Sequence, residues 1–160
     1  MNNSSRFVKL SGIVLAVSTL AACGGGGMAE DDSPEGQAFE YRHSVMHVLA
    51  YKMGQIGGMA REEIPLDEAV FDKAVHDLAA SAGMVTEGFM PEGIPAGSRS
   101  LPDIWTNWSD FEQKAKDLED AADGLVAAVE RGGFTEAKGL VQGTAQTCGG
   151  CHRAYRERTE

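Results

Sequence analysis

Two cysteines and a histidine lie within five consecutive residues near the end of the chain, as Cys148, Cys151 and His152. Residues three and four apart share one face of an α-helix, so all three side chains would leave the same side of a helix. The pattern C-x-x-C-H is typical of covalent haem attachment, in which two thioether bonds hold the haem and the imidazole reaches the iron. We therefore expect one covalent haem c, with Cys148 and Cys151 as its thioether residues and His152 as the axial ligand of the iron.

Three other uses of this motif have weaker support in the sequence. A thioredoxin-like redox motif needs a βαβ context, and no segment alternates apolar and polar residues as a strand would. A zinc site needs further ligands, but His43, His47 and His76 are not spaced as a second ligand pair with another cysteine. A disulfide between helical positions i and i+3 would leave His152 without a role. A non-haem zinc or dithiol protein is the alternative from another class.

Helical periodicity surrounds the motif. Ser33 is a plausible N-cap with Pro34 at the first helical position, and an apolar seam follows on which Phe39, Met46 and Met53 repeat every seven residues. We expect four helices at about 34–61, 67–86, 102–131 and from 135 onward, with a Gly- and Pro-rich loop at 88–100. Four amphipathic helices in succession predict an all-α, antiparallel four-helix bundle.

The first 22 residues have the pattern of a targeting segment. Arg6 and Lys9 make its start positive, and residues 10–22 form an apolar run that is too short to span a bilayer. The run ends in Leu-Ala-Ala directly before Cys23, which resembles a bacterial lipobox; an ordinary cleavage site is the alternative. We expect a lipoprotein signal peptide at 1–22, a lipidated Cys23 with a flexible tether at 23–32, and the bundle domain at 33–160.

The charge of the chain bounds its partners and location. Its net charge is −10, and removing residues 1–22 takes away two of the 14 basic residues, which leaves 12 against 24 acidic ones and a net charge of −12. This balance argues against nucleic acid as a partner. We expect a lipid-anchored protein on the periplasmic side of a bacterial membrane. Gly24 after the lipidated cysteine favours the outer membrane.

Several stretches of the sequence resemble the cytochrome c′ family, the class II c-type cytochromes. They are YRHSVM at 41–46, PEG at 91–93, LPDIW at 101–105 and CGGCHRAYR at 148–156. The similarity extends over about residues 37–158, and a haem motif so late in the chain together with YRHSVM early in it is more specific than the motif alone. The resemblance implies a four-helix bundle with one covalent haem.

The resemblance also implies roles for three further residues. It puts Met46 on the distal side of the haem, Arg42 near a haem propionate and Arg156 near the proximal histidine. The residue pattern agrees in part, because Arg42 and Met46 are four apart on one helix face, as are His152 and Arg156. The alternatives are a surface arginine for Arg42 and a base that complements the helix dipole for Arg156.

Met46 separates two functions. If its sulfur binds the iron, six-coordinate His/Met ligation suits one-electron transfer to a redox partner protein. If the sulfur only packs nearby, the resemblance implies a five-coordinate haem that binds nitric oxide or carbon monoxide. Electron transfer is the leading expectation. His43 and His47 flank the seam and are expected to be surface residues, although as an i, i+4 pair they could hold an adventitious metal.

Two expectations concern activity and assembly. No nucleophile is paired with a base in the sequence, so we do not expect an enzyme. The resemblance to the cytochrome c′ family implies a homodimer through the first two helices, which the methionines and glycines around residues 53–59 permit.

Overall fold

Helix α1 begins at the residue that the sequence predicts. The Ser33 hydroxyl accepts a hydrogen bond from the Gly36 amide at 3.0 Å, and Pro34 is the first helical residue. The helix then continues over Pro34–Ala60. Its predicted seam is buried in part, with Leu49 and Ile56 inside and Met46 half-buried.

The structure is a computed structural model, and it describes residues 31–158. The expected signal peptide at 1–22, Cys23 and all but the last two residues of the expected tether lie outside this range. Among the described helices, none is both long enough and apolar enough to cross a membrane.

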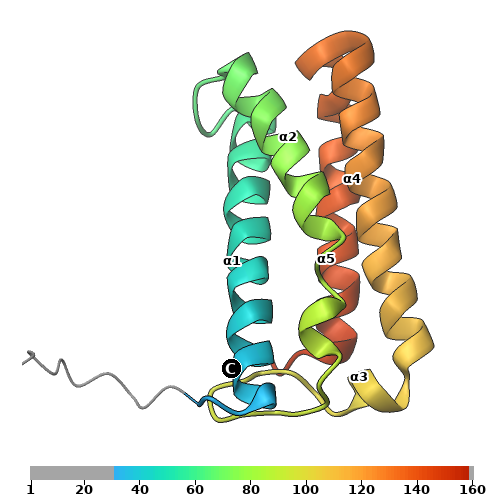
Figure 1. Cartoon of the computed structure of the whole chain (residues 1–160). Helices are drawn as coiled ribbons and strands as arrows, with labels where there is room; N and C mark the ends of the chain where they lie inside the picture. Colours follow the sequence, from blue (N-terminus) through green and yellow to red (C-terminus); the bar gives the residue numbers. More distant parts are fainter. Residues whose placement is uncertain (1–30, 159–160) are drawn as a thin grey trace, which may run out of the picture.

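Four long helices run alternately up and down and form an antiparallel bundle (Figure 1). They are α1, α2 (Glu68–Ala82), α4 (Trp108–Ala137) and α5 (Val141–Tyr155). Shorter helical segments connect them, namely η1 (Glu87–Phe89), α3 (Asp103–Thr106) and η2 (Lys138–Leu140). Within residues 31–158 the only β-type pairing is a single antiparallel bridge between Ser100 and Arg156, so the predicted all-α fold is confirmed.

Several helix boundaries differ from those that the sequence predicts. The last helix, expected from 135, begins at Val141, after α4 and η2. Helix α2 starts after the Asp67 N-cap as expected but ends at Ala82, four residues before the predicted end. The predicted helix over 102–131 is divided at Asn107, whose φ of −121° and ψ of 41° separate α3 from α4. The expected end of the third helix at about 131 is marked by a kink, because Gly132 and Gly133 have non-helical backbone angles, although α4 continues to Ala137.

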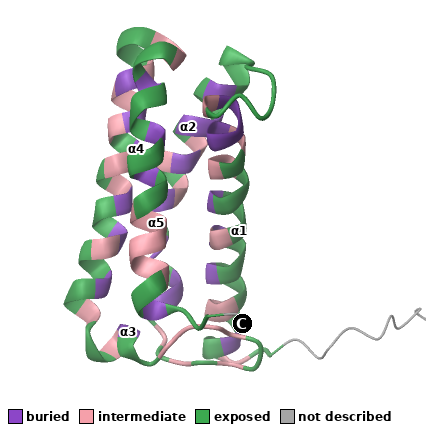
Figure 2. Ribbon diagram, turned by 180° about the vertical axis from the view of Figure 1, so that it is seen from behind, coloured by how far each residue is buried: buried purple, intermediate pink, exposed green. Residues whose placement is uncertain are grey.

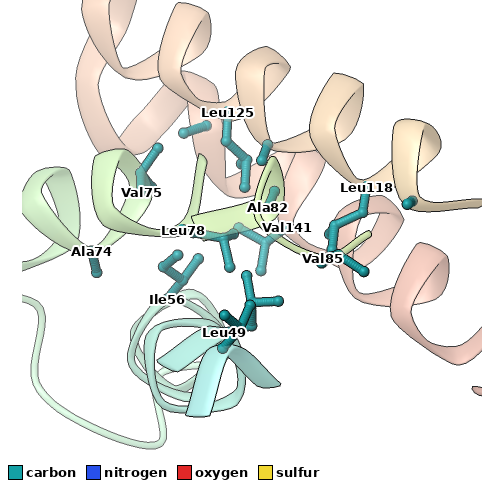
Figure 3. Close-up of a cluster of buried hydrophobic side chains, with 14 of the residues drawn as sticks. Leu49, Ile56, Ala74, Val75, Leu78, Ala82, Val85, Leu118, Leu125 and Val141 are labelled. Atoms are coloured by element: carbon teal, nitrogen blue, oxygen red, sulfur yellow. The ribbon is translucent and has the colours of Figure 1, made fainter. Parts of the chain in front are cut away.

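Apolar side chains fill the end of the bundle where α2 runs. Figure 3 shows side chains from α1, α2, α4 and α5 pointing toward one another there, among them Ile56, Leu78, Leu125 and Val141. Because α2 has 15 residues and α1 has 27, α2 is only about 22 Å long against about 40 Å for α1. The other end of the bundle therefore has three helices, α1, α4 and α5, and an irregular fourth wall, the segment 84–100.

Candidate functional site

A cavity of about 500 Å³ occupies the end of the bundle that α2 does not reach. Its walls are α1, α4, α5 and parts of the segment 84–100, and most of the lining is apolar. All six residues that the sequence assigns to a haem site in the bundle line this one cavity; they are Arg42, Met46, Cys148, Cys151, His152 and Arg156. The fold thus brings together two groups that are about a hundred residues apart in sequence.

Helix α5 presents the C-x-x-C-H motif to the cavity. Residues 147–152 are all half-buried, and Figure 2 shows this stretch as the half-buried part of α5. The helix is held on both sides of the motif, because Thr144 and Tyr155 are buried. In addition, the Tyr155 hydroxyl donates a hydrogen bond of 2.6 Å to the Asp110 carboxylate on α4. The motif is therefore fixed on a rigid element, as a precisely placed site requires.

The protonation states of the motif argue against a dithiol function. Burial raises the pKa of Cys151 to about 11 and also raises the pKa of Cys148, so both thiols are protonated at neutral pH. The thiolate is the reactive form in disulfide exchange, and here it is disfavoured. Cys148 and Cys151 form no disulfide with each other.

His152 is held in the form that binds metals. Burial, and next the positive charge of Arg156, lower the pKa of His152, so the imidazole is neutral at pH 7. In the described part of the chain, no three His, Cys, Asp or Glu side chains converge in a way that could hold a metal ion. The zinc alternative therefore has no site with three or more such protein ligands within residues 31–158.

Arg42 is buried, with 4% of its surface exposed, and it joins α1 to the segment that follows α2. Its guanidinium donates hydrogen bonds to the carbonyl of Gly88 at 3.3 Å, the carbonyl of Gly93 at 3.2 Å and the hydroxyl of Ser98 at 3.2 Å. It also lies over the rings of Phe39 and Phe89, at 5.3 and 5.1 Å from their centroids. Arg42 is therefore not a surface residue. Its hydrogen bonds hold the segment 84–100, the fourth wall of the cavity, against α1.

Arg156 lies just after the last turn of α5, and its side chain is exposed at the cavity. Its backbone pairs with Ser100, and the neighbouring Glu157 amide donates to the carbonyl of Arg99 at 2.9 Å. These contacts tie the end of α5 to the segment 84–100. The position is consistent with an arginine on the side of the cavity that His152 occupies.

Met46 and Met53 line the cavity from α1, and both are half-buried. His43 and His47 also line the cavity but are exposed. Both histidines are therefore exposed, as the sequence predicts. The sequence did not predict that they line the cavity.

Two basic residues of the cavity, Arg99 and Lys114, were missed by sequence reasoning. Arg99 lies in the segment 84–100 and donates to the carbonyl of Glu157 at 2.5 Å. Lys114 lies on α4, 3.5 Å from the carboxylate of Asp110. Arg99 could only have been noticed as a base inside a Gly- and Pro-rich loop, because loops carry no periodicity that assigns a residue to a face.

The donor set of the cavity fits a covalent haem. The walls are apolar, as a porphyrin ring requires, and the lining contains four cations but neither aspartate nor glutamate. Those cations suit two propionates, which are anionic. Two protonated thiols and one neutral imidazole share the α5 wall, which matches two thioether bonds and one axial ligand.

Comparison with known proteins gives related chains and folds. Residues 37–156 match a family model described as cytochrome C′. Cytochrome c-554 of Cereibacter sphaeroides is 34% identical over 135 residues, which cover 82% of this chain and 88% of that protein. Cytochrome c prime from Shewanella frigidimarina has a TM-score of 0.74 at 28% identity, over 80% of this chain and all of that one. A variant of cytochrome c prime from Alcaligenes xylosoxidans, solved as a nitrosyl complex, has a TM-score of 0.71 at 26% identity, covering 81% and 100% of the two chains.

Proposed function

This chain belongs to the cytochrome c′ family, whose members bind one covalent haem c, and from that premise we propose that it carries single electrons through a haem held by Cys148, Cys151 and His152. The observation that supports the assignment most is the convergence of all six expected residues on one cavity. When bound, the haem supplies a one-electron Fe(III)/Fe(II) couple. Within this proposal the two cysteines fix the group on α5, and His152 offers its neutral imidazole to the iron.

The remaining residues would orient and shield the group. Arg42 and Arg156 would meet the propionate and proximal sides, and Arg42 still has a free Nε donor after its three hydrogen bonds. Met46 would offer its sulfur from the α1 wall. The apolar walls exclude water from the ring, which keeps the surroundings nearly unchanged between oxidation states.

Attachment is tested by the absorption of the chain expressed with a working cytochrome-maturation system. The intact chain should give a Soret band that survives denaturation and acid extraction with organic solvent, because the bonds are covalent. A double Cys148→Ala, Cys151→Ala variant should lose the extraction-resistant haem. A colourless intact chain would overturn the assignment.

A second function, binding of nitric oxide or carbon monoxide, is supported by the related nitrosyl complex. Met46 decides between the two functions, and Met53 is a matched control because it is also half-buried, on α1 and at the cavity. If electron transfer is correct, the ferric protein shows a weak sulfur-to-iron charge-transfer band at the red edge of the visible. Met46→Leu should abolish the band and Met53→Leu should not. Prompt binding of carbon monoxide by the unmodified ferrous protein would instead favour the gas-binding function.

We also propose that the protein is held at the periplasmic side of a membrane by lipid on Cys23, with the outer membrane favoured. The support comes from the sequence, in the lipobox-like run before Cys23 and in Gly24 after it. Labelling with a clickable fatty acid should mark the intact chain, and Cys23→Ser should abolish the label. Fractionation of the labelled cells then distinguishes the two membranes.

A homodimer through α1 and α2 is the remaining part of the proposal. It is supported by apolar side chains that α1 exposes, of which Tyr51 is 65% exposed and Val48 is 42% exposed. Sedimentation equilibrium of the haem-loaded protein should give twice the monomer mass, and Tyr51→Glu should shift the equilibrium toward monomer. A monomer at every concentration would remove the dimer and leave the haem assignment intact.

A further inference from the structure

Two histidines on α1 form a pair that the haem assignment does not use. His43 and His47 are one helical turn apart, both are exposed, and their Nε2 atoms lie 3.2 Å from each other. The two rings are nearly perpendicular, with an interplanar angle of 88° and a centroid distance of 4.5 Å. The two Nε2 atoms are joined by a hydrogen bond, in which one ring donates and the other accepts.

The distance between the two nitrogens is the one that a shared metal ion requires. Imidazole nitrogen binds zinc at about 2.0–2.1 Å, and an ion at that distance from two nitrogens 3.2 Å apart makes an N–metal–N angle of about 100°. This angle lies between the 90° of octahedral or square-planar ligands and the 109° of tetrahedral ligands. The spacing of the pair therefore suits one ion, which replaces the hydrogen bond between the rings once both rings carry their proton on Nδ1.

We propose that His43 and His47 bind one divalent transition-metal ion, such as Zn²⁺, Cu²⁺ or Ni²⁺, at the edge of the cavity. These are the divalent ions that imidazole ligands suit, whereas Mg²⁺ and Ca²⁺ prefer oxygen. No third His, Cys, Asp or Glu side chain converges with the pair in residues 31–158. Water fills the remaining positions, so the ion is exchangeable and is not a structural component of the fold.

One ring of the pair is held in place by a neighbour on α1. The ring of Phe39 stacks on His43 at 5.6 Å with an interplanar angle of 14°, which restricts the imidazole before any ion binds. The nearest arginine in sequence, Arg42, lines the same cavity, but it is buried and its guanidinium donates to the segment 84–100. Within residues 31–158, the cavity that the pair borders is lined by four cations and no carboxylate, so the two imidazoles, and not a local negative charge, hold the ion.

The histidine pair is separate from the expected haem ligands, but it lies close enough to the cavity for ion binding to affect the haem spectrum. His43 and His47 line the same cavity as Met46, which lies between them in the sequence. Binding an ion therefore changes the charge next to the cavity, and the haem spectrum gives a second signal. The two ligands belong to the chain itself, so the inference does not depend on which ligand the iron has.

The test is a calorimetric titration of the haem-loaded full chain with Zn²⁺, in which attached haem keeps Cys148, Cys151 and His152 from competing. We expect one ion per chain for the unmodified protein. His43→Gln and His47→Gln should each weaken binding at least tenfold. His76→Gln is the matched control, because His76 is an exposed helical histidine that faces only Asp72, and it should bind Zn²⁺ like the unmodified chain.

A second measurement identifies the ligands directly. One equivalent of Cu²⁺ should give an electron paramagnetic resonance spectrum with coupling to two nitrogens, and His47→Gln should reduce this to one. Far-ultraviolet circular dichroism and the Soret band show that each variant is folded and loaded. Equal Zn²⁺ affinity in all three histidine variants, or a spectrum without nitrogen coupling, would overturn the inference even if the haem is present.

Discussion

At the scale of single residues, the buried side chain of Arg42 makes several polar and aromatic contacts that a substitution would remove. It is buried, donates three hydrogen bonds to the segment 84–100 and lies between two aromatic rings. Burial lowers its pKa, yet the guanidinium stays charged at any physiological pH. Its charge is therefore compensated by carbonyl dipoles and π-faces, because no described carboxylate pairs with it.

We predict that Arg42→Gln destabilises the protein by about 3 kcal/mol, because removal of a buried, charged donor leaves its acceptors unpaired. Arg156→Gln is the control, since Arg156 is exposed and such changes usually stay within about 0.5 kcal/mol. Urea unfolding of the haem-loaded variants measures both effects. Equal stability of the two variants would show that Arg42 does not hold the segment 84–100.

At the scale of elements, the kink near the end of α4 depends on backbone conformation. Gly133 has a φ of 62° and a ψ of −153°, which is a region that only glycine adopts readily. We predict that Gly133→Ala costs about 1–3 kcal/mol of stability. Gly143→Ala, within α5 and with open space for a methyl group, should instead stabilise by about 0.5–1 kcal/mol. Thermal unfolding of the two variants should move in opposite directions.

The joint between α1 and α2 contains an ionic contact with a definite pH dependence. Asp77 on α2 lies 2.7 Å from Lys52 on α1 and 2.8 Å from Lys73, and hydrogen bonds from these two lysines lower the pKa of Asp77 to about 2. Because the folded-state pKa is depressed, this contribution is present above the ordinary aspartate pKa and disappears as the pH falls through about 2.

We therefore predict that Asp77→Asn lowers stability at neutral pH and that its difference from the unmodified protein shrinks between about pH 4 and pH 2. Urea midpoints measured across this range test it. Asp123→Asn is a suitable control, since Asp123 is exposed on α4 and forms no ion pair with any residue of 31–158. A difference for Asp77→Asn that grows toward low pH would contradict the assignment.

Many helix boundaries and most site residues could be predicted from the sequence, and individual elements show why. The start of α1 could be predicted because Ser33 and Pro34 act locally. The early end of α2 could not, because residues 83–86 continue an apolar pattern while the backbone turns away. The motif residues of the site were predictable from spacing, whereas Arg99 reaches the cavity from a loop whose course depends on Arg42 and on the end of α5.

At the scale of the whole molecule, the charges are unevenly distributed. Every lysine within residues 31–158 lies within 4.0 Å of a carboxylate, as do Arg61 and Arg131. The other arginines of that range have no described carboxylate so close, and they belong to the cavity end of the bundle: Arg42, Arg99, Arg153, Arg156 and Arg158. A chain with net charge −10 thus has a cationic region around its cavity.

We predict that ferricyanide, an anion, oxidises the ferrous protein more slowly as ionic strength rises, although two like net charges alone would give the opposite trend. Stopped-flow spectrophotometry of the haem measures the rate. The double variant Arg99→Gln, Arg156→Gln should slow the reaction several-fold at low salt. The double variant Arg131→Gln, Lys138→Gln changes the net charge equally at the far end of α4 and should have little effect. Equal effects would show that only net charge matters.

Helix α1 starts at the same end of the bundle as the cavity, and the C-terminal end of the described chain lies there too (Figures 1 and 2). If Cys23 carries lipid as proposed, at most about 30 Å of extended chain separates the bilayer from Asp31. The end of the bundle that contains the cavity would then be tethered near the bilayer. The protein would meet its redox partners by diffusion along the membrane surface. Electron donors or acceptors in the same membrane could reach the cavity end directly. Partners in solution would have to enter the space between the bundle and the bilayer.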